Sequence, residues 1–367
     1  MTLRGADRAL VRDALASGDP LPGTTGFAGL VDDRLVRDVL GRVPLFVERG
    51  ADDPTADDAW AFEPAALDDP ELVPAGAVVG PDDPAPTTRW SLPDPDPDPD
   101  RSAALDRLRE AIETAADAAT SGTGDVAVAF SGGVDSALVA ELLDAPLYVV
   151  GFPDSHDVEA ARTAADAMGR DLTVVDLEPS DLERAVPAVA RAIGRTNAMD
   201  VQIALPLYLV GERIAADGFD SLTLGQGADE LFGGYEKVVH LDHRVEADTV
   251  RGAVREGIRS LPDQLPRDVL TVEAAGLEPV TPLLHDAVID AALRLPDALL
   301  ADEERRKRGL RLVATDYLPE KIAYRDKKAV QYGSLVAREL DRLARQAGYK
   351  RRMDDHVTKY VESLLDE

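Results

Sequence analysis

The chain has 367 residues, a formal net charge of −29 and no cysteine, which excludes disulfides, thiolate metal sites and a cysteine nucleophile within these residues. Hydrophobic residues make up 45% of the chain, enough for a packed core. No apolar run approaches the roughly 20 residues of a membrane span, and the N-terminus lacks the apolar region of a signal peptide. We therefore expect a cytoplasmic protein with no membrane partner.

The acidity is spread along the whole chain, with 69 acidic against 40 basic residues. One interpretation is a surface that attracts cations or repels partners, and the other is adaptation to a salt-rich cytoplasm, as in a halophile. We favour the halophilic interpretation, because a short Debye length at molar salt hides the repulsion and because the charge is not confined to a tail. The same charge disfavours nucleic acid as a partner.

Residues 93–100 alternate proline with aspartate and predict an extended linker, because proline is excluded from helix interiors and like charges repel. The sequence thus predicts a domain over 1–92, a linker over 93–101 and a second domain over 102–367. Residues 1–92 are rich in glycine, proline and short apolar runs, which favours a small, mostly β domain.

Downstream of the linker, short apolar runs alternate with stretches of helical spacing. This alternation predicts an α/β fold with a doubly wound, five-stranded parallel sheet and a helical C-terminal extension from about residue 250. The predicted strands are 126–130, 147–150, 172–177 and 222–224, and the predicted helices are 134–143, 156–168, 181–193 and 202–216.

The sequence SGGVDS at 131–136, here called the glycine loop, joins the first of these strands to the first helix. Gly132 and Gly133 can adopt backbone angles closed to other residues, and the amides that follow belong to a helix N-terminus. Ser131 and Ser136 add hydroxyl donors. We predict a phosphate-binding loop; the alternative is a plain tight turn capped by serine.

The glycine loop resembles the pyrophosphate loop of the N-type ATP pyrophosphatases, which include the GMP, NAD, argininosuccinate and asparagine synthetases. The resemblance implies an adenine nucleotide α-hydrolase-like fold and an enzyme that cleaves ATP between its α and β phosphates and adenylates a substrate. It also implies which residues contact the nucleotide: Ser131, Gly132, Gly133, Asp135, Ser136, Val150, Leu224 and Gly225.

A second stretch, LGQGADELFGGY at 224–235, resembles the signature of the synthetase domain of asparagine synthetases; residues 225–235 are called the acidic loop below. Asp229 is expected to share Mg²⁺ with Asp135, because magnesium is held by one or two carboxylates and phosphate oxygens. The alternative for Asp229 is helix N-capping. Within the same motif, Gln226 and Glu230 are the further candidate catalytic residues.

Residues 324–328, YRDKK, resemble the family's R-x-K element, so that Lys327 would be the catalytic lysine. A cation there would neutralise charge on the α-phosphate and on pyrophosphate. The alternative is that Lys327 and Lys328 are solvated surface lysines. Residues 276–284 resemble the family's GVEARVPFL segment.

Residues 27–47 resemble the RDxLGxxPLF stretch of the glutaminase domain of asparagine synthetases, and residues 60–76 resemble its later part. This portion is about half the family's usual length and lacks the cysteine nucleophile, so glutamine hydrolysis by that route is excluded. We expect a structural remnant that packs on the synthetase domain. Nitrogen would then come from free ammonia, from an amine, or from a separate ammonia-supplying partner; the sequence makes no prediction of a homo-oligomer.

Three positions depart from the family pattern. Gln226 replaces the glutamate that would take the proton of the attacking amine, and an amide is not a base. Gln202 and Val280 replace two arginines, the natural partners of a substrate carboxylate. We expect an AMP-forming amide synthetase with aspartate as the default acid. The alternatives are a β-lactam synthetase-like ligase with another acid and amine, or a weakened nucleotide-binding module.

Overall fold

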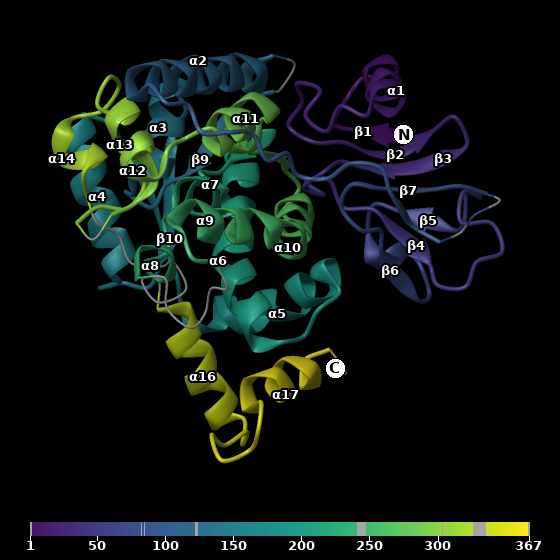
Figure 1. The fold of residues 1–367 in the computed structure, drawn as a ribbon. Coiled ribbons are helices and arrows are strands. Elements are labelled where there is room, and N and C mark those ends of the chain that lie inside the picture. The colour runs from purple at the N-terminus through teal and green to yellow at the C-terminus, as the bar shows by residue number, and fades with distance from the viewer. Residues whose placement is uncertain are drawn as a thin grey trace. The chain divides into compact units, whose positions relative to one another are not determined.

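Five parallel strands form one sheet in the computed structural model, which describes residues 2–81, 83, 85–121, 124–240, 247–302, 304–325 and 335–365 (Figure 1). The chain divides into two units that are discontinuous in sequence. Unit 1 comprises Met1–Ser121, Gly225–Val269 and Thr281–Asp316, and unit 2 comprises Gly122–Leu224, Leu270–Val280 and Tyr317–Glu367. The division predicted at the Pro-Asp segment is a different one and stays a prediction.

The parallel sheet belongs to unit 2 and has the order β11-β10-β9-β12-β13. From the central β9 the chain runs outward to β10 and β11, then returns to β12 and β13 on the other side. The strand order therefore reverses between β9 and β12, where open α/β sheets hold their ligands. The strands are β9 (Val126–Ala129), β10 (Leu147–Gly151), β11 (Leu172–Asp176), β12 (Ser221–Thr223) and β13 (Glu278–Val280).

Helices α3 (Val134–Leu142) and α4 (His156–Met168) connect β9, β10 and β11 and contact these strands. Helix α5 (Pro179–Ile193) packs on α6 (Ala198–Ala216), which contacts β9, β10 and β12. Because crossovers between parallel strands are right-handed, α3 and α4 cover one face and α5 and α6 the other. Helix α14 (Glu320–Ala323) contacts α3 and α4, and α16 (Val336–Gln346) and α17 (His356–Ser363) pack on α5 and α6. The predicted α/β class is confirmed.

The fifth strand of the predicted five-stranded sheet is β13, whose position the sequence analysis did not identify; it lies within the C-terminal region that is otherwise mostly helical. Each residue of β13 pairs with β12, including Pro279 opposite Leu222. Proline has no N–H to donate, which restricts it to edge strands such as β13. A three-residue strand interrupted by proline carries no alternation from which it could be recognised.

The N-terminal part of unit 1 is mostly β, as predicted, with two antiparallel sheets of order β1-β2-β3-β7-β8 and β5-β4-β6. Helix α1 (Arg8–Ser17) was not predicted; Asp7 caps its N-terminus and Gly18, with a φ of +79°, ends it. The strands are β1 (Leu3–Arg4), β2 (Ala28–Val31), β3 (Arg34–Arg37), β4 (Phe46–Glu48), β5 (Trp60–Ala61), β6 (Pro70–Leu72), β7 (Ala77–Val79) and β8 (Thr87–Thr88).

The remainder of unit 1 is helical. Helix α2 packs against α11, α13 and the 3₁₀ helix η2, and α7 contacts α9, α11 and α13. These elements are α2 (Arg101–Thr120), α7 (Ala228–Phe232), α8 (Glu236–His240), α9 (Val250–Arg259), α10 (Leu261–Ala274, which continues into unit 2), η2 (Pro282–Leu284), α11 (Asp286–Leu293), α12 (Asp297–Leu300) and α13 (Arg308–Ala314). Across the described residues, no helix is long and apolar enough to cross a membrane.

The Pro-Asp segment contains no helix or strand, as expected, but it is not a free spacer. Arg255 of α9 donates to the carbonyl of Leu92 at 2.8 Å and to that of Pro93. Arg251 donates to the carbonyl of Pro95, and both arginines pair with Asp94. Two arginines of one helix therefore offset the aspartate charge and hold the segment in place.

A buried ion network joins the N-terminal part of unit 1 to its helical part. Arg42 is 4% exposed and forms salt bridges with Asp38 at 2.8 Å and Asp286 at 2.7 Å. Its guanidinium also donates to the carbonyl of Leu284 at 2.7 Å, and the amide of Thr24 donates to Asp286. Removing one partner of such a network leaves an uncompensated buried charge, at a cost of about 3–5 kcal/mol.

Candidate functional site

The glycine loop leaves β9 at the carboxyl edge of the parallel sheet and enters α3. Gly132 has a φ of +71°, and a Cβ at this position would lie 2.7 Å from the carbonyl oxygen of Ala160. Glycine is therefore required here by both conformation and space. Gly133 corrects the prediction, since its φ of −81° and ψ of 162° are open to any residue.

The two serines of the loop bond to each other, and neither accepts a capping hydrogen bond from the amides at the start of α3. The Ser131 amide donates to Ser136 Oγ at 3.2 Å, and the two hydroxyl oxygens lie 3.1 Å apart. Ser136 Oγ also donates to the carbonyl of Gly133 at 3.3 Å. The N-cap of α3 is Gly133, with no side-chain cap, so the alternative of a serine-capped turn is wrong.

The first amides of α3 can hold an anion. Gly133, Val134 and Asp135 begin the helix, where the amides have no intrahelical acceptor and carry partial positive charge. The carboxylate of Asp135 lies in the same first turn. A site made in this way from backbone amides supplies anion-binding donors without using any basic side chain.

Val150 and Leu224 lie at the same edge of the sheet as the glycine loop. Tyr148 pairs with Ala129 in the β9–β10 register, which brings Val150 level with Ser131. Thr223 pairs with Val128, and the amide of Leu224, one residue later, donates to the carbonyl of Val280. The two predicted nucleotide contacts are therefore placed at the sheet edge, although their contact with nucleotide stays a prediction.

Arg325 is a residue near the glycine loop to which the sequence analysis gave no role of its own. Its Nη1 donates to the carbonyl of Ala160 at 2.6 Å, and this is the carbonyl that faces Gly132. It lies two residues before Lys327, which is outside the described residues together with Lys328. The R-x-K resemblance of residues 324–328 pointed to this stretch, with Arg325 as its arginine, but it was used only to select Lys327.

The acidic loop forms the short helix α7 between two left-handed glycines. Gly227, with a φ of +87°, precedes it, and a Cβ there would lie 2.3 Å from Leu284 Cδ2. Gly233, with a φ of +72°, ends it. Because Gly227 occupies the N-cap position and Asp229 lies in the first turn, the N-cap alternative for Asp229 is wrong.

Asp229 is paired with a lysine that the sequence analysis did not select. Lys307 Nζ lies 2.7 Å from Asp229 Oδ1; the lysine side chain is 8% exposed and the aspartate side chain 47% exposed. Lys307 has a φ of +55° and precedes α13, 78 residues along the chain from Asp229. A Cβ on Gly234 would overlap both side chains, so this glycine allows the pair to form.

Glu230 is buried, with 6% of its surface exposed, and accepts a short hydrogen bond from the hydroxyl of Tyr235. Burial raises the pKa of Glu230, and the tyrosine hydrogen bond partly offsets this rise. Burial, together with the neighbouring Glu230 carboxylate, raises the pKa of Tyr235 above its ordinary value. The tyrosine therefore keeps its proton as the donor of this bond.

Gln226 Nε2 donates a short hydrogen bond to Asp268 Oδ2 of α10. Asp268 is in turn held by Arg267, whose Nε lies 2.7 Å from Oδ1. The position that departs from the family pattern thus has a carboxylate partner 42 residues away. Of the other two departures, Val280 is buried in β13 and Gln202 is half-buried in α6.

The predicted site residues divide between the two units. Unit 2 contains the glycine loop with Val150 and Leu224, and unit 1 contains Gly225, Gln226, Asp229 and Glu230. The predicted metal ligands Asp135 and Asp229 belong to different units, and their sharing of one ion stays a prediction. Among the described residues, no three or more His, Asp or Glu side chains form a group that could hold a metal ion.

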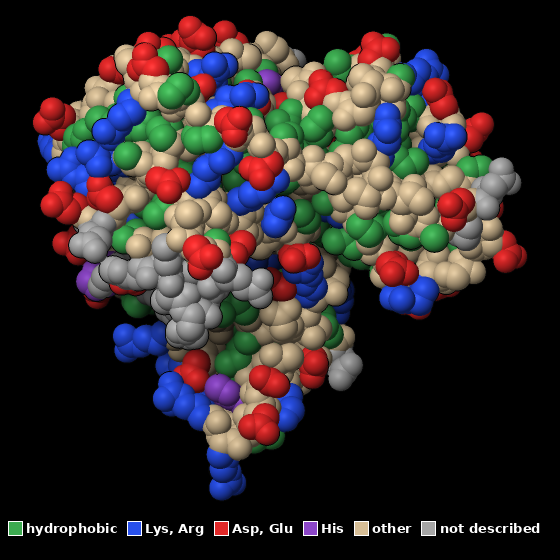
Figure 2. Space-filling model, in the orientation of Figure 1, with side chains coloured by type: hydrophobic (Ala, Val, Ile, Leu, Met, Phe, Trp, Pro, Cys, Tyr) green, Lys and Arg blue, Asp and Glu red, His purple; other side chains and the backbone are tan. Residues whose placement is uncertain are grey.

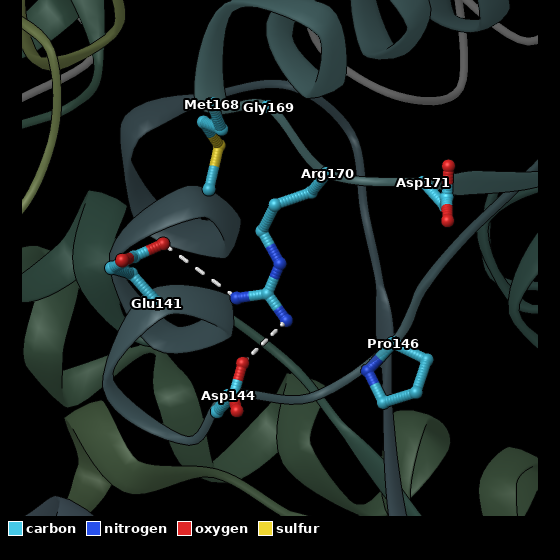
Figure 3. Close-up of a pocket in the computed structure, with 7 residues that line it drawn as sticks. All are labelled: Glu141, Asp144, Pro146, Met168, Gly169, Arg170 and Asp171. Carbon is cyan, nitrogen blue, oxygen red and sulfur yellow. Dashed lines mark hydrogen bonds and ion pairs between the residues drawn. The ribbon is translucent and has the colours of Figure 1, made fainter.

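A pocket of about 530 Å³ lies at the opposite edge of the sheet from the glycine loop, beside Pro146 before β10 (Figure 3). Arg170 points into it between Glu141 and Asp144, and also donates to the carbonyls of Ala140 and Ala145 at 3.0 Å. This guanidinium already binds the C-terminal end of α3. The pocket is therefore a structural feature and does not belong to the predicted nucleotide site.

The family model for asparagine synthase matches residues 107–269 and 242–366. These spans include the glycine loop, the acidic loop and Lys307. They leave residues 1–106, and with them both antiparallel sheets of unit 1, outside the match.

Curated relatives agree with this match. Putative asparagine synthetase [glutamine-hydrolyzing] 1 of Methanocaldococcus jannaschii is 29% identical to the chain over 284 residues. The matched region covers 67% of this chain and 52% of that protein. It is 24% identical to asparagine synthetase B of Escherichia coli, over 62% of this chain and 45% of that protein. A Lotus japonicus asparagine synthetase is 27% identical over 86% of this chain and 58% of its own length. The chain thus spans about half the length of the curated relatives it matches.

Proposed function

Because the chain belongs to the asparagine synthase family, we propose that it is an ATP-dependent, AMP-forming amide synthetase, a carbon–nitrogen ligase. Its proposed substrates are ATP, a carboxylic acid with aspartate as the first choice, and ammonia or another amine. The observation that carries this proposal is the glycine loop, where Gly132 adopts a conformation and a close approach that only glycine allows, directly before the first turn of α3.

In the proposed first step, the substrate carboxylate attacks the α-phosphorus of ATP. A carbon-bound oxygen bonds to phosphorus, the bond to the bridging oxygen breaks, and pyrophosphate leaves with the electron pair. The amides at the start of α3 and the hydroxyl of Ser131 would bind pyrophosphate as its charge develops. Lys327 remains the proposed cationic residue for this step.

Magnesium fits the chemistry of these residues. Asp135 and Asp229 would be the proposed protein ligands, because carboxylate and phosphate oxygens suit this hard cation. Bound magnesium would neutralise charge on the phosphate oxygens. Asp229 is already oriented by Lys307, which fixes its carboxylate in one direction and neutralises part of its charge.

In the proposed second step, an amine attacks the acyl carbon of the adenylate and AMP leaves. The 367 residues contain no cysteine, so we propose that the nitrogen does not come from glutamine hydrolysed by a thiol of this chain. Free ammonia, an amine substrate or a separate ammonia-supplying protein would provide it. A β-lactam synthetase-like ligase is the second candidate, favoured by Val280 and Gln202 at positions where the family pattern has arginine.

Pyrophosphate release tests the proposal. Purified protein is mixed with ATP, magnesium chloride, ammonium chloride and one acid from a panel that includes aspartate and other amino acids. We expect release that depends on both ATP and one acid, with AMP and an amide as products identified by mass spectrometry. Nucleotide binding without release from any acid would instead indicate a nucleotide-binding module.

We further propose that the protein is adapted to molar salt. Figure 2 shows acidic side chains scattered among basic ones over the visible face, in keeping with the net charge of −29. Screening weakens the repulsion among these charges as salt rises. Thermal melting in molar and millimolar KCl tests this: we expect the folded state to be lost at low KCl, and equal melting temperatures would contradict it.

A further inference from the structure

The hydrogen bond between Gln226 and Asp268 fixes how the glutamine side chain is turned. A carboxylate can only accept hydrogen bonds, so the glutamine must present its NH₂ group to Asp268. Its carbonyl oxygen Oε1 then points away from Asp268. Asp268 therefore decides which of the two flipped orientations the Gln226 side-chain amide adopts.

Asp268 is itself held rigidly. Arg267 donates from Nε to Oδ1 at 2.7 Å and from Nη2 to Oδ2 at 3.1 Å. The two residues are only 6% and 8% exposed. An arginine that donates to both oxygens of a carboxylate fixes its plane, and it keeps its charge at every physiological pH.

The carbonyl oxygen of Gln226 is buried and accepts no hydrogen bond from any residue that the structure describes. A buried acceptor without a donor is unfavourable, and most such groups in proteins are paired. This oxygen belongs to the acidic loop, four residues before Glu230 and three before Asp229. A ligand with an N–H group would satisfy it.

Resting on the proposed amide-forming step, we propose that Asp268 is a positioning residue that turns Gln226 so that Oε1 accepts an N–H of an uncharged amine. An uncharged amine can donate one N–H to Gln226 while its lone pair stays free for attack. The nitrogen lone pair forms the C–N bond, and the bond from the acyl carbon to the phosphate oxygen breaks, with its electron pair leaving on AMP. One nitrogen proton goes to solvent water, because an amide oxygen is not a base.

Asp268→Asn tests this positioning. The asparagine oxygen would stay with Arg267, so its NH₂ group would face Gln226 and turn the glutamine carbonyl toward itself. At a fixed ammonium chloride concentration, a smaller share of the acyl-adenylate should then react with the amine to form amide, and a larger share should be hydrolysed by water to the free acid. We expect the ratio of amide to hydrolysed acid to fall about tenfold, the size of one lost hydrogen bond, with pyrophosphate release unchanged.

The double variant Gln226→Glu/Asp268→Asn moves the negative charge to position 226. The asparagine NH₂ would donate to one glutamate oxygen, and the other oxygen would accept from the amine. We expect the product ratio to return to at least the wild-type value. Gln226→Glu alone places two carboxylates in contact, so it should melt at a lower temperature than the double variant, a readout that needs no activity.

Asp263→Asn and Gln264→Glu, both on α10, are the matched controls for the two substitutions and should leave the product ratio unchanged. Hydroxylamine in place of ammonium chloride provides a second amine probe. The acid is the one that gives the largest pyrophosphate release with wild-type protein.

The outcomes are distinguishable. A tenfold lower ratio for Asp268→Asn that is restored in the double variant supports the inference. An unchanged ratio in Asp268→Asn, or a reduced ratio that the double variant does not restore, overturns it while normal pyrophosphate release leaves the proposed function in place. No release from wild-type protein with any acid overturns the proposed function and this inference with it.

Discussion

The glycine loop and the acidic loop follow neighbouring parallel strands, but they are built in opposite ways. The glycine loop uses backbone amides, one left-handed glycine and two hydroxyls that bond to each other, all within six residues. The acidic loop uses the side chains of Gln226 and Asp229, whose partners Asp268 and Lys307 lie far along the chain. A site made of backbone is specified locally, whereas a site made of side-chain pairs depends on residues that the fold brings to it.

The largest effect is expected from Gly132→Ala. The added Cβ would meet the carbonyl oxygen of Ala160 at 2.7 Å, so the loop would have to shift. Displacing a reacting group by about an ångström costs on the order of 100-fold in rate, and we expect a loss of pyrophosphate release of that size.

Gly169→Ala is the control for this substitution. Gly169 has a similar φ of +68°, but a Cβ there would meet no atom within 4 Å. This variant therefore measures the effect of placing alanine at a left-handed backbone position without a steric clash like that with Ala160. Equal activity of the two alanine variants would show that the close approach at Gly132 is not part of the site.

Lys307→Met tests whether the acidic loop depends on its distant partner. Because Asp229 is 47% exposed, losing this pair should cost only about 0–1 kcal/mol of stability. The same change should lower pyrophosphate release roughly tenfold or more, since a hydrogen bond to a charged group would be lost from the site. Chemical denaturation and a release assay are compared, with Lys321→Met, an exposed lysine of α14, as control. A loss of stability with full activity would make Lys307 a structural residue.

Ser136→Ala should have a smaller effect, on the glycine loop alone. It removes the hydroxyl that bonds to Ser131 and Gly133, at an expected cost of about 1–2 kcal/mol. The thermal shift on adding ATP should shrink relative to wild-type protein. Ser363→Ala, which removes one hydroxyl bond to the carbonyl of Tyr360, should leave the ATP shift unchanged.

The smallest effect is a pH dependence in the acidic loop. Because burial raises the pKa of Glu230, the folded protein binds the proton more tightly than the unfolded chain does. Stability from this group is present at low pH and is lost as pH rises through the raised pKa. Relative to Glu230→Gln, wild-type protein should therefore lose stability as pH rises above the ordinary pKa range of a glutamate, at constant KCl.

Denaturation curves of both proteins at several pH values provide the measurement, and Glu236→Gln, an exposed residue of α8, is the control. A constant difference between wild-type protein and Glu230→Gln would contradict the assignment of burial as the dominant influence on this carboxyl.

The sequence by itself determined the α/β class, four of the five parallel strands and the glycine loop, because apolar periodicity and glycine conformation are local properties. Only the tertiary structure revealed β13, since a short edge strand with proline has no pattern of its own. The pairs of Gln226 with Asp268, of Asp229 with Lys307 and of Arg325 with the Ala160 carbonyl were likewise visible only in the tertiary structure. Charged residues are too frequent in this chain for composition to select these partners. What selects them is burial, because a charge removed from water needs a partner that the fold must supply.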